Sequence, residues 1–512
     1  MTNLKRRDFV AGAVGLALTG PAGGPAAGQA PKRGGVLKVS ANANPSSLDP
    51  QTGGSGSDHA FLYPVFDTLV DFEPATLQAI PGLAESWSNP DPRTLLLNIR
   101  AGVTFHDGTP LDAAAVKANL ERARGDARSN IKGDLATVES IEIAGPQQVA
   151  LRMKQPDSSL LLTLSDRAGM MSSPKATQEL GKDYDRRPVG AGPMKFVSWN
   201  DNEKVVYARN ERYWRSGQPL LDGLEMNVIP EINTALRAVT AGQNDFVYFL
   251  SPQQKPLVER ARNLTAVSGP TLYCVIVFLN FSRPPLNDLR VRQALNYAID
   301  RESFAKATMA GLSEVATTVL PKAHWAYDPT LANYYPYDPD KAKALLAEAG
   351  FKDGLDLHLI GYTDQRQQQR QEVLQEQLRK IGIRLRFSTF NIPEGSAAFF
   401  AKAEGNGLLS QWTGRPDPSL TFTLLYGKGS YFNSGREEAT PDITAALAAT
   451  RASADIAERK KAFSVLQRLV LEQALSVPLL FQFELDAHAN KVKGFRPNLL
   501  GKPRFDGVWL DG

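Results

Sequence analysis

A short apolar run near the middle of the chain, residues 272–279 (LYCVIVFL), places the main constraint on the fold. It is too short to cross a membrane, and its β-branched and aromatic residues predict a buried strand. Pro284 and Pro285 end the extended segment, and Asn287 or Asp288 can cap the amphipathic helix that follows. A buried strand that delivers the chain to the first helix of another core predicts a crossing between two domains.

The composition limits the class of protein. With 512 residues, of which 42% are hydrophobic and 22% charged, the chain is long enough for two or more cores. The formal net charge is only +4, and the basic residues are interleaved with acidic ones, so we expect no nucleic-acid partner. Cys274 is the single cysteine, which excludes an internal disulfide and a cysteine-based zinc cluster. Its place in the apolar run predicts a small buried hydrophobe.

The first thirty residues predict an export signal, residues 1–30. The basic pair Arg6 and Arg7 precedes an apolar stretch, residues 10–19, that is too short and too rich in glycine to span a membrane. The pair resembles a twin-arginine export motif, although Lys5 stands where that motif usually has Ser or Thr, so a Sec-type signal is the alternative. No cysteine follows the apolar stretch, and we therefore expect a periplasmic protein without a lipid anchor.

The chain before the crossing alternates extended and helical patterns. A helix capped by Asp112 and a helix stopped by Gly242 are expected among strands at 36–40, 94–100, 138–143, 149–154, 194–199, 204–209, 224–229 and 245–248. The last two strands flank the second helix, and this arrangement predicts a βαβ unit with at least part of its sheet parallel.

The chain after the crossing repeats this pattern. Asp338 begins a helix that Gly350 ends, and strands at 355–359 and 383–387 flank a helix over 365–381. A last helix over 456–472 precedes an apolar strand at 477–483 that returns towards the first domain. Crossings near 270–282 and 478–490 together predict a double hinge between two α/β lobes.

Four segments carry a family resemblance that extends from about Gly35 to Phe495. They are LNFSRPPLNDLRVRQALNYAIDRE after the apolar run, LAESW and FHDGTP in the first lobe, and YDPDKAKALLAEAGF in the second. The chain resembles the solute-binding proteins of peptide-type ABC importers, a family that also binds nickel complexes, glutathione, opines and some sugars. The resemblance implies the two-lobed α/β fold of periplasmic binding proteins, with an extra subdomain in the first lobe.

The domain boundaries follow from the two crossings. We expect lobe I at 31–275 and 485–512, with a subdomain at about 60–185, and lobe II at 276–484. The resemblance also implies partners, which are a peptide or peptide-like ligand and an inner-membrane ABC permease, and a protein that acts as a monomer.

The strongest candidate for a ligand site is the loop after the strand at 408–412. Trp412, Arg415 and Asp417 arrive there together, and loops at the carboxyl ends of strands are where open α/β sheets bind ligands. In the resembled peptide binders, an acidic residue after this strand takes the ammonium group of the ligand, and Asp417 matches that position best. Arg415 could pair with Asp417 or clamp a ligand carboxylate. The alternative is that Asp417 only caps the helix that begins at Pro418.

Further candidates are weaker. Ser47 belongs to a turn-rich loop, residues 44–50, that the family places near its cleft, and Tyr431 and Asn433 could line the cleft as well. Tyr273 and Asn280 flank the crossing and are expected either at the hinge or cleft or in the packing of the sheet. The glycine-rich segment 53–56 lacks the Lys-Ser/Thr of a phosphate-binding loop and is expected to be a flexible loop.

No catalytic constellation is apparent. The chain has no GxSxG, HExxH or CxxC motif. His106 beside Asp107 lies in a turn-forming run, and the other histidines show no metal-ligand spacing. We therefore expect no catalytic residues, no metal and no cofactor. An exported hydrolase is the alternative of another class, and a nickel chelate, glutathione, an opine or an oligosaccharide are the alternatives to a peptide ligand.

Overall fold

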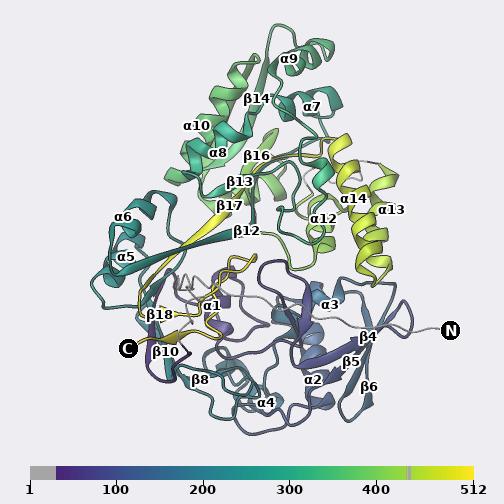
Figure 1. Ribbon diagram of the computed structural model, residues 1–512. Helices are drawn as coiled ribbons and strands as arrows, with labels where there is room; N and C mark the ends of the chain where they lie inside the picture. Colours follow the sequence, from purple (N-terminus) through teal and green to yellow (C-terminus); the bar gives the residue numbers. More distant parts are fainter. Residues whose placement is uncertain (1–29, 434, 436–439) are drawn as a thin grey trace, which may run out of the picture.

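The computed structural model describes residues 30–433, 435 and 440–512, so the predicted export signal lies outside the described residues. The chain forms an upper and a lower part that two long strands join (Figure 1). These strands are β12 (Leu264–Leu279) and β17 (Ser476–Ala489), and they pair antiparallel with each other. They lie where the two crossings were predicted, and in the text below lobe I is the lower part and lobe II the upper part.

Both hinge strands are longer than predicted. The apolar runs at 272–279 and 477–483 account for only part of each strand, because the remaining residues mix apolar side chains with polar ones, glycine and proline. The extra length comes from pairing of the two strands with each other, from Leu264 opposite Ala489 to Phe278 opposite Ser476. Local sequence could not show this, since the partners lie far apart in the chain.

One 11-stranded sheet runs through both lobes. Its order is β15-β14-β16-β12-β17-β11-β1-β10-β9-β8, with β13 (Ser313–Val315) paired to β17. The lobe II strands are β14 (Leu355–Tyr362), β15 (Ile383–Phe390) and β16 (Gly407–Trp412). The lobe I strands are β1 (Val36–Ala41), β8 (Met194–Asn200), β9 (Lys204–Arg209), β10 (Gly223–Val228) and β11 (Phe246–Val247). Parallel pairs β1–β10, β1–β11 and β14–β15 confirm the predicted mixed α/β class.

The apolar run of β12 is continuous because both of its faces are buried. Cys274, Ile276 and Phe278 belong to one core cluster, and the alternate residues Val275 and Val277 belong to another. The first core packs against α12 (Pro418–Tyr426), α13 (Pro441–Ala452) and α14 (Ile456–Glu472). The second packs against α7 (Leu289–Tyr297), α8 (Arg301–Met309), α9 (Pro339–Glu348) and α10 (Gln365–Arg379).

A separate four-stranded antiparallel sheet lies in lobe I, within the residues of the predicted subdomain. Its order is β4-β5-β7-β6, built from β4 (Ala84–Ser88), β5 (Thr94–Ile99), β7 (Gln148–Met153) and β6 (Val138–Gly145), and α2 (Ala113–Gly125) packs on it. The predicted caps are observed, since Asp112 accepts from the Ala115 amide and Asp338 from the Lys341 amide. The exact residue boundaries of lobes and subdomain remain predictions.

The remaining elements are short. Two-stranded sheets pair β2 (Val70–Phe72) with β3 (Ala79–Pro81) and β18 (Val492–Lys493) with β19 (Trp509–Leu510). The other helices are α1 (His59–Leu62), α3 (Leu160–Thr163), α4 (Pro174–Leu180), α5 (Ile232–Thr240), α6 (Lys255–Arg260) and α11 (Ile392–Ser396). In the part of the chain that the structure describes, no helix combines the length and the apolar character needed to cross a bilayer.

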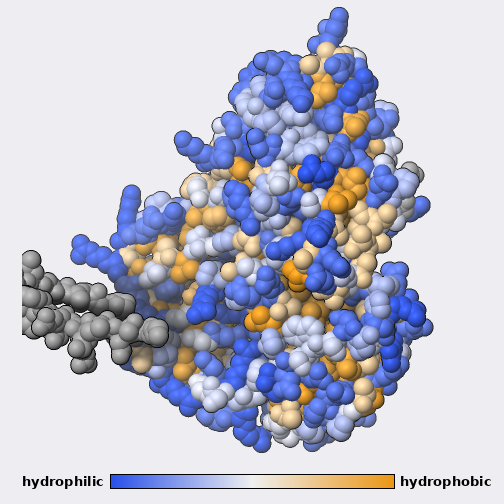
Figure 2. Space-filling model, turned by 45° about the vertical axis from the view of Figure 1, so that its right-hand side comes forward, coloured by the Kyte–Doolittle hydropathy of each residue, from blue (hydrophilic) through white to orange (hydrophobic). Residues whose placement is uncertain are grey.

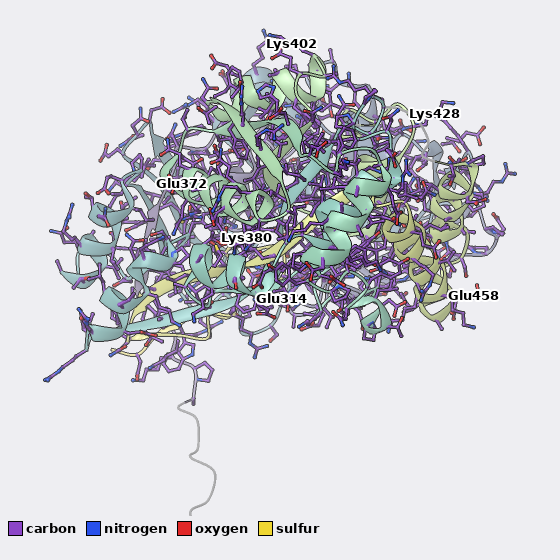
Figure 3. The ribbon with its side chains drawn as sticks, turned by 90° about the horizontal axis from the view of Figure 1, so that it is seen from above. Glu314, Glu372, Lys380, Lys402, Lys428 and Glu458 are labelled. Carbon is purple, nitrogen blue, oxygen red and sulfur yellow. The ribbon has the colours of Figure 1, made fainter. Side chains whose placement is uncertain are left out.

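The surface is mainly polar, and its charges are mixed. On the face seen in Figure 2, apolar residues gather near the waist where the upper part meets the lower part. Seen from above, the exposed side chains of Lys402, Lys428 and Glu458 stand at the rim of lobe II (Figure 3).

Candidate ligand-binding cleft

A cavity of about 380 Å³ lies between the two lobes, directly at the hinge. Lobe II contributes the loop after β16, which was the predicted ligand loop, and the hinge strand β12 contributes Tyr273. Lobe I contributes four segments that are distant in sequence, and the polar and glycine residues among them are Gly53, Gly54, Ser55, Gly56, Asn130, Asp134, Thr163, Asp166, Arg167 and Lys502. The volume lies in the range of small-molecule sites.

The glycine-rich segment 53–56 forms part of the cleft wall and is held in place by buried charges. The Arg167 guanidinium donates to the Gly53 carbonyl (2.7 Å) and pairs with Asp58 (3.1 Å), and the Asp58 carboxylate also accepts from the Ser55 amide (3.1 Å). A Cβ at position 53 would come within 2.6 Å of the Arg167 Nη1 atom, so this position requires glycine. The sequence predicted a flexible loop at 53–56, and its place in the cleft wall was not predicted.

A second set of charged side chains completes the part of the cleft wall that lobe I forms. Asp166 Oδ1 lies 2.5 Å from His59 Nε2, and Lys502 Nζ lies 3.4 Å from Asp166 Oδ2 and 3.0 Å from His59 Nε2. Burial tends to raise the pKa of Asp166, but Lys502 and His59 outweigh it and hold that pKa well below 3.8. Asp166 is therefore ionised and already paired with Lys502. Nothing in the sequence pattern pointed to Lys502, which returns to the cleft from the C-terminal segment.

Arg415 and Asp134 are the two charged groups of the cleft that the protein leaves open. Arg415 donates to the carbonyl of its neighbour Gly414 (2.7 Å), and its guanidinium lies 5.2 Å from the centre of the Trp412 ring. Among the described residues, no carboxylate lies within 4.0 Å of Arg415, and no cation lies within that distance of Asp134. Desolvation and the nearby Asp166 raise the pKa of Asp134 to about 6. The cleft thus presents a guanidinium from lobe II and a carboxylate from lobe I.

Asp417 occupies a different environment from its neighbour Arg415. It is fully buried, caps α12 by accepting from the Ser419 amide (2.8 Å), and pairs through both oxygens with Arg459 (2.9 Å each). It does not line the cleft. This geometry favours the capping role that the sequence left open, and an ammonium-binding role for Asp417 stays a prediction without support from these contacts.

The other predicted residues are spread over several places. Trp412 is buried in the lobe II core, and the centre of its ring lies 5.2 Å from the Arg415 guanidinium. Ser47 is buried and lies 2.9 Å from the Thr52 hydroxyl, outside the cleft lining. Tyr431 is half exposed against Phe400, and Asn433 donates to the Gly427 carbonyl (3.0 Å); neither lines the cleft. Trp412 thus contacts the cleft residue Arg415.

The lobes contact each other beside the cleft. The Ser158 amide of lobe I donates to the Arg451 carbonyl of lobe II (3.0 Å), and the Arg451 side chain lies 4.0 Å from Asp157. Two α/β lobes joined by paired strands, with a charged cleft between them, define the architecture of a ligand-binding protein.

The family is shown by comparison with known proteins. Residues 78–433 match the model of the bacterial extracellular solute-binding proteins, family 5, and the chain belongs to this family. It is therefore a solute-binding protein, the substrate-binding component of an ABC importer, and not an enzyme, which confirms the class that the sequence motifs indicated.

Individual relatives support the assignment. The chain is 29% identical over 480 residues to the glutathione-binding protein GsiB of Salmonella paratyphi A, covering 89% of this chain and 91% of that protein. It is similar in structure to the periplasmic binding protein DppA of Helicobacter pylori, solved with the peptide STSA (TM-score 0.80, 24% identity, 94% of this chain and 99% of that one). HbpA2 of Haemophilus parasuis is similar as well (TM-score 0.83, 23% identity, 93% and 100%). These structures confirm the periplasmic binding protein fold.

Proposed function

We propose that this protein captures a short peptide or peptide-like solute that carries both an ammonium and a carboxylate group. The observation that supports this most is the open charge pair of the cleft. Arg415 of lobe II would bind the ligand carboxylate, and Asp134 of lobe I would bind the ammonium group. A guanidinium without a carboxylate partner in a partly desolvated cleft favours an anionic ligand group, since such charge-assisted bonds are the strong ones.

Glutathione is the first member of this class to test. It has an ammonium group and carboxylates at both ends, and the similarity to the glutathione-binding GsiB covers most of both chains. A metal chelate fits less well, because no histidine or cysteine is among the described residues that line the cleft. An oligosaccharide also fits less well, because Tyr273 is the only aromatic side chain among those lining residues.

Ligand binding and closure would be linked. A ligand that touches Asp134 and Arg415 together can do so only when the lobes are closed, so it stabilises the closed state over the open one. The residues around Ser158 and Arg451 would be in contact only in that state. We propose further that the export signal directs the chain to the periplasm, where the closed monomer delivers its solute to the inner-membrane permease.

A calorimetric titration with matched ligands tests the proposal. Glutathione, unmodified di- and tripeptides, their N-acetylated forms and their C-terminal amides are compared on the same mature protein. We expect binding by zwitterionic ligands and an affinity loss of about tenfold or more when either charge is blocked, since a hydrogen bond to a charged group contributes about 1.5–3 kcal/mol. Equal affinity for blocked and unblocked ligands would contradict the role of the Arg415–Asp134 pair, and binding of sugars or nickel chelates alone would reject the peptide class.

A further inference from the structure

The largest cavity described in this chain lies outside the cleft. It measures about 520 Å³ and is built only from lobe I, because all of its lining residues fall outside 276–484. Its walls come from β2, β3 and the turn between them, from the segment before β10, and from the C-terminal residues 494–509. Since lobe II contributes nothing to it, this lobe I cavity keeps its shape whether the cleft is open or closed.

Most of the lining is apolar. Phe72, Leu221 and Trp509 are buried side chains of the wall, and Ile80 is an exposed large apolar residue at its edge. Prolines at several positions stiffen the lining, since each fixes its own φ angle. A pre-formed apolar recess of this size, with a few polar groups, is the usual form of a site for a small organic molecule.

Three arginines but only two carboxylates are among the residues that line the cavity. Asp71 lies between two guanidinium groups, Arg215 (2.9 Å) and Arg504 (2.7 Å), and Arg504 also pairs with Asp506 (2.7 Å). Burial tends to raise the pKa of Asp71, but Arg504 and Arg215 outweigh it and lower that pKa to about 2. Asp71 is thus ionised, and both carboxylates are paired with these two arginines. Arg496 is exposed at the cavity and has no hydrogen bond or ion pair with any described residue.

We propose that the lobe I cavity is a second binding site, which takes a small aromatic carboxylate independently of the cleft. The ring would lie against Ile80, Phe72 and Leu221, and the carboxylate would pair with Arg496 at the rim. The protein would therefore hold two ligands of different chemistry at once, a zwitterion between the lobes and an amphipathic anion within lobe I. No covalent step is involved.

A titration with 2-naphthoate tests the inference on the mature, ligand-free protein. Binding is followed by calorimetry and by the fluorescence of Trp509, which lines the cavity. We expect Arg496→Ala to weaken binding by about tenfold, Arg496→Lys to restore part of the loss, and Ile80→Trp to abolish binding by filling the recess. Arg262→Ala, which removes an exposed arginine outside the cavity, is the matched control and should leave the affinity unchanged.

Competition separates this site from the cleft. Saturating glutathione and the Arg415→Ala variant should leave 2-naphthoate binding intact, so that failure of the cleft proposal would not affect this one. The neutral amide of the same ring should bind about tenfold more weakly, since it cannot pair with Arg496. The inference is overturned if the folded wild type binds no 2-naphthoate at millimolar concentration. It is also overturned if binding survives Arg496→Ala and Ile80→Trp, or disappears in Arg415→Ala.

Discussion

Replacing Asp417 by Asn separates its capping role from a role in ligand binding. The carboxylate is fully buried against Arg459, whose side chain is 4% exposed. Removing one partner of such a buried pair leaves an uncompensated charge and costs about 3–5 kcal/mol. Asn is a good N-cap, so the bond to the Ser419 amide is retained and the change isolates the ion pair. We therefore expect a loss of about 3–5 kcal/mol in the free energy of unfolding.

The assay measures both the free energy of unfolding and the affinity for the ligand. Urea unfolding of the ligand-free protein gives the free energy, and calorimetry well below the melting temperature gives the dissociation constant of the best ligand from the screen. Because Asp417 lies outside the cleft lining, we expect that constant to change by less than about twofold, or under about 0.5 kcal/mol.

A double-mutant cycle provides the control. Arg459→Met keeps the volume of the side chain that packs on Trp325 (5.1 Å) and Phe463 (5.5 Å) but removes its charge. The double variant leaves no unpaired charge, so it should be more stable than the sum of the two single losses predicts, by about 1–3 kcal/mol. A variant Asp417→Asn with wild-type stability and lost affinity would refute this reasoning and restore the ammonium-binding role.

Three further predictions follow from the cleft and the hinge. Arg415→Ala should weaken binding of carboxylate ligands by about 1.5–3 kcal/mol, measured by calorimetry, while the melting temperature stays within about a degree, since among the described residues the Arg415 guanidinium donates a hydrogen bond only to the Gly414 carbonyl. Affinity for ammonium-bearing ligands should fall as the pH drops through about 6, where Asp134 becomes protonated, and an Asp134→Asn variant should bind weakly with no such pH dependence. Burial raises the pKa of Asp486 on β17 from 3.8 to about 7. The stability that this group contributes is therefore complete below its pKa in the unfolded chain, and it is lost as the pH rises through about 7. The free energy of unfolding of Asp486→Asn should depend less on pH between these two pKa values.

Local chemistry allowed much of the fold to be predicted. Caps such as Asp112, Asp338 and Asp417 and the alternation along β14 are read from a few neighbouring residues, and the structure has each of them. The double crossing was also predictable, because an apolar run buried on both faces has a composition of its own.

The candidate site was predicted less well, because its chemistry depends on distant partners. Nothing near Asp417 in the sequence shows that Arg459 takes up both of its oxygens. In the same way, the Arg167 guanidinium occupies the space that a side chain at position 53 would need, and Lys502 reaches the cleft from the C-terminal segment. Only Arg415 and Tyr273 could be placed at the cleft from sequence. Arg415 lies in the predicted ligand loop and Tyr273 lies on the predicted crossing, and these two segments line the cleft.

The shared strand β17 determines the order in which this protein can fold. It pairs with β12 and β13 on the side of lobe II and with β11 on the side of lobe I, so both halves of the large sheet depend on it. The last residues then tie lobe I to its own beginning, where the Asp511 side chain pairs with Lys32. A chain still emerging from the ribosome lacks β17 until Ser476–Ala489 has been made, and neither lobe has a complete sheet before then.

This protein therefore cannot fold one lobe after the other during synthesis, as chains with consecutive domains do. Its long-range pairing can form only after nearly the whole polypeptide exists, and pairing of this kind is typical of proteins that fold slowly. Truncation before β17 should remove the complete sheet of both lobes together.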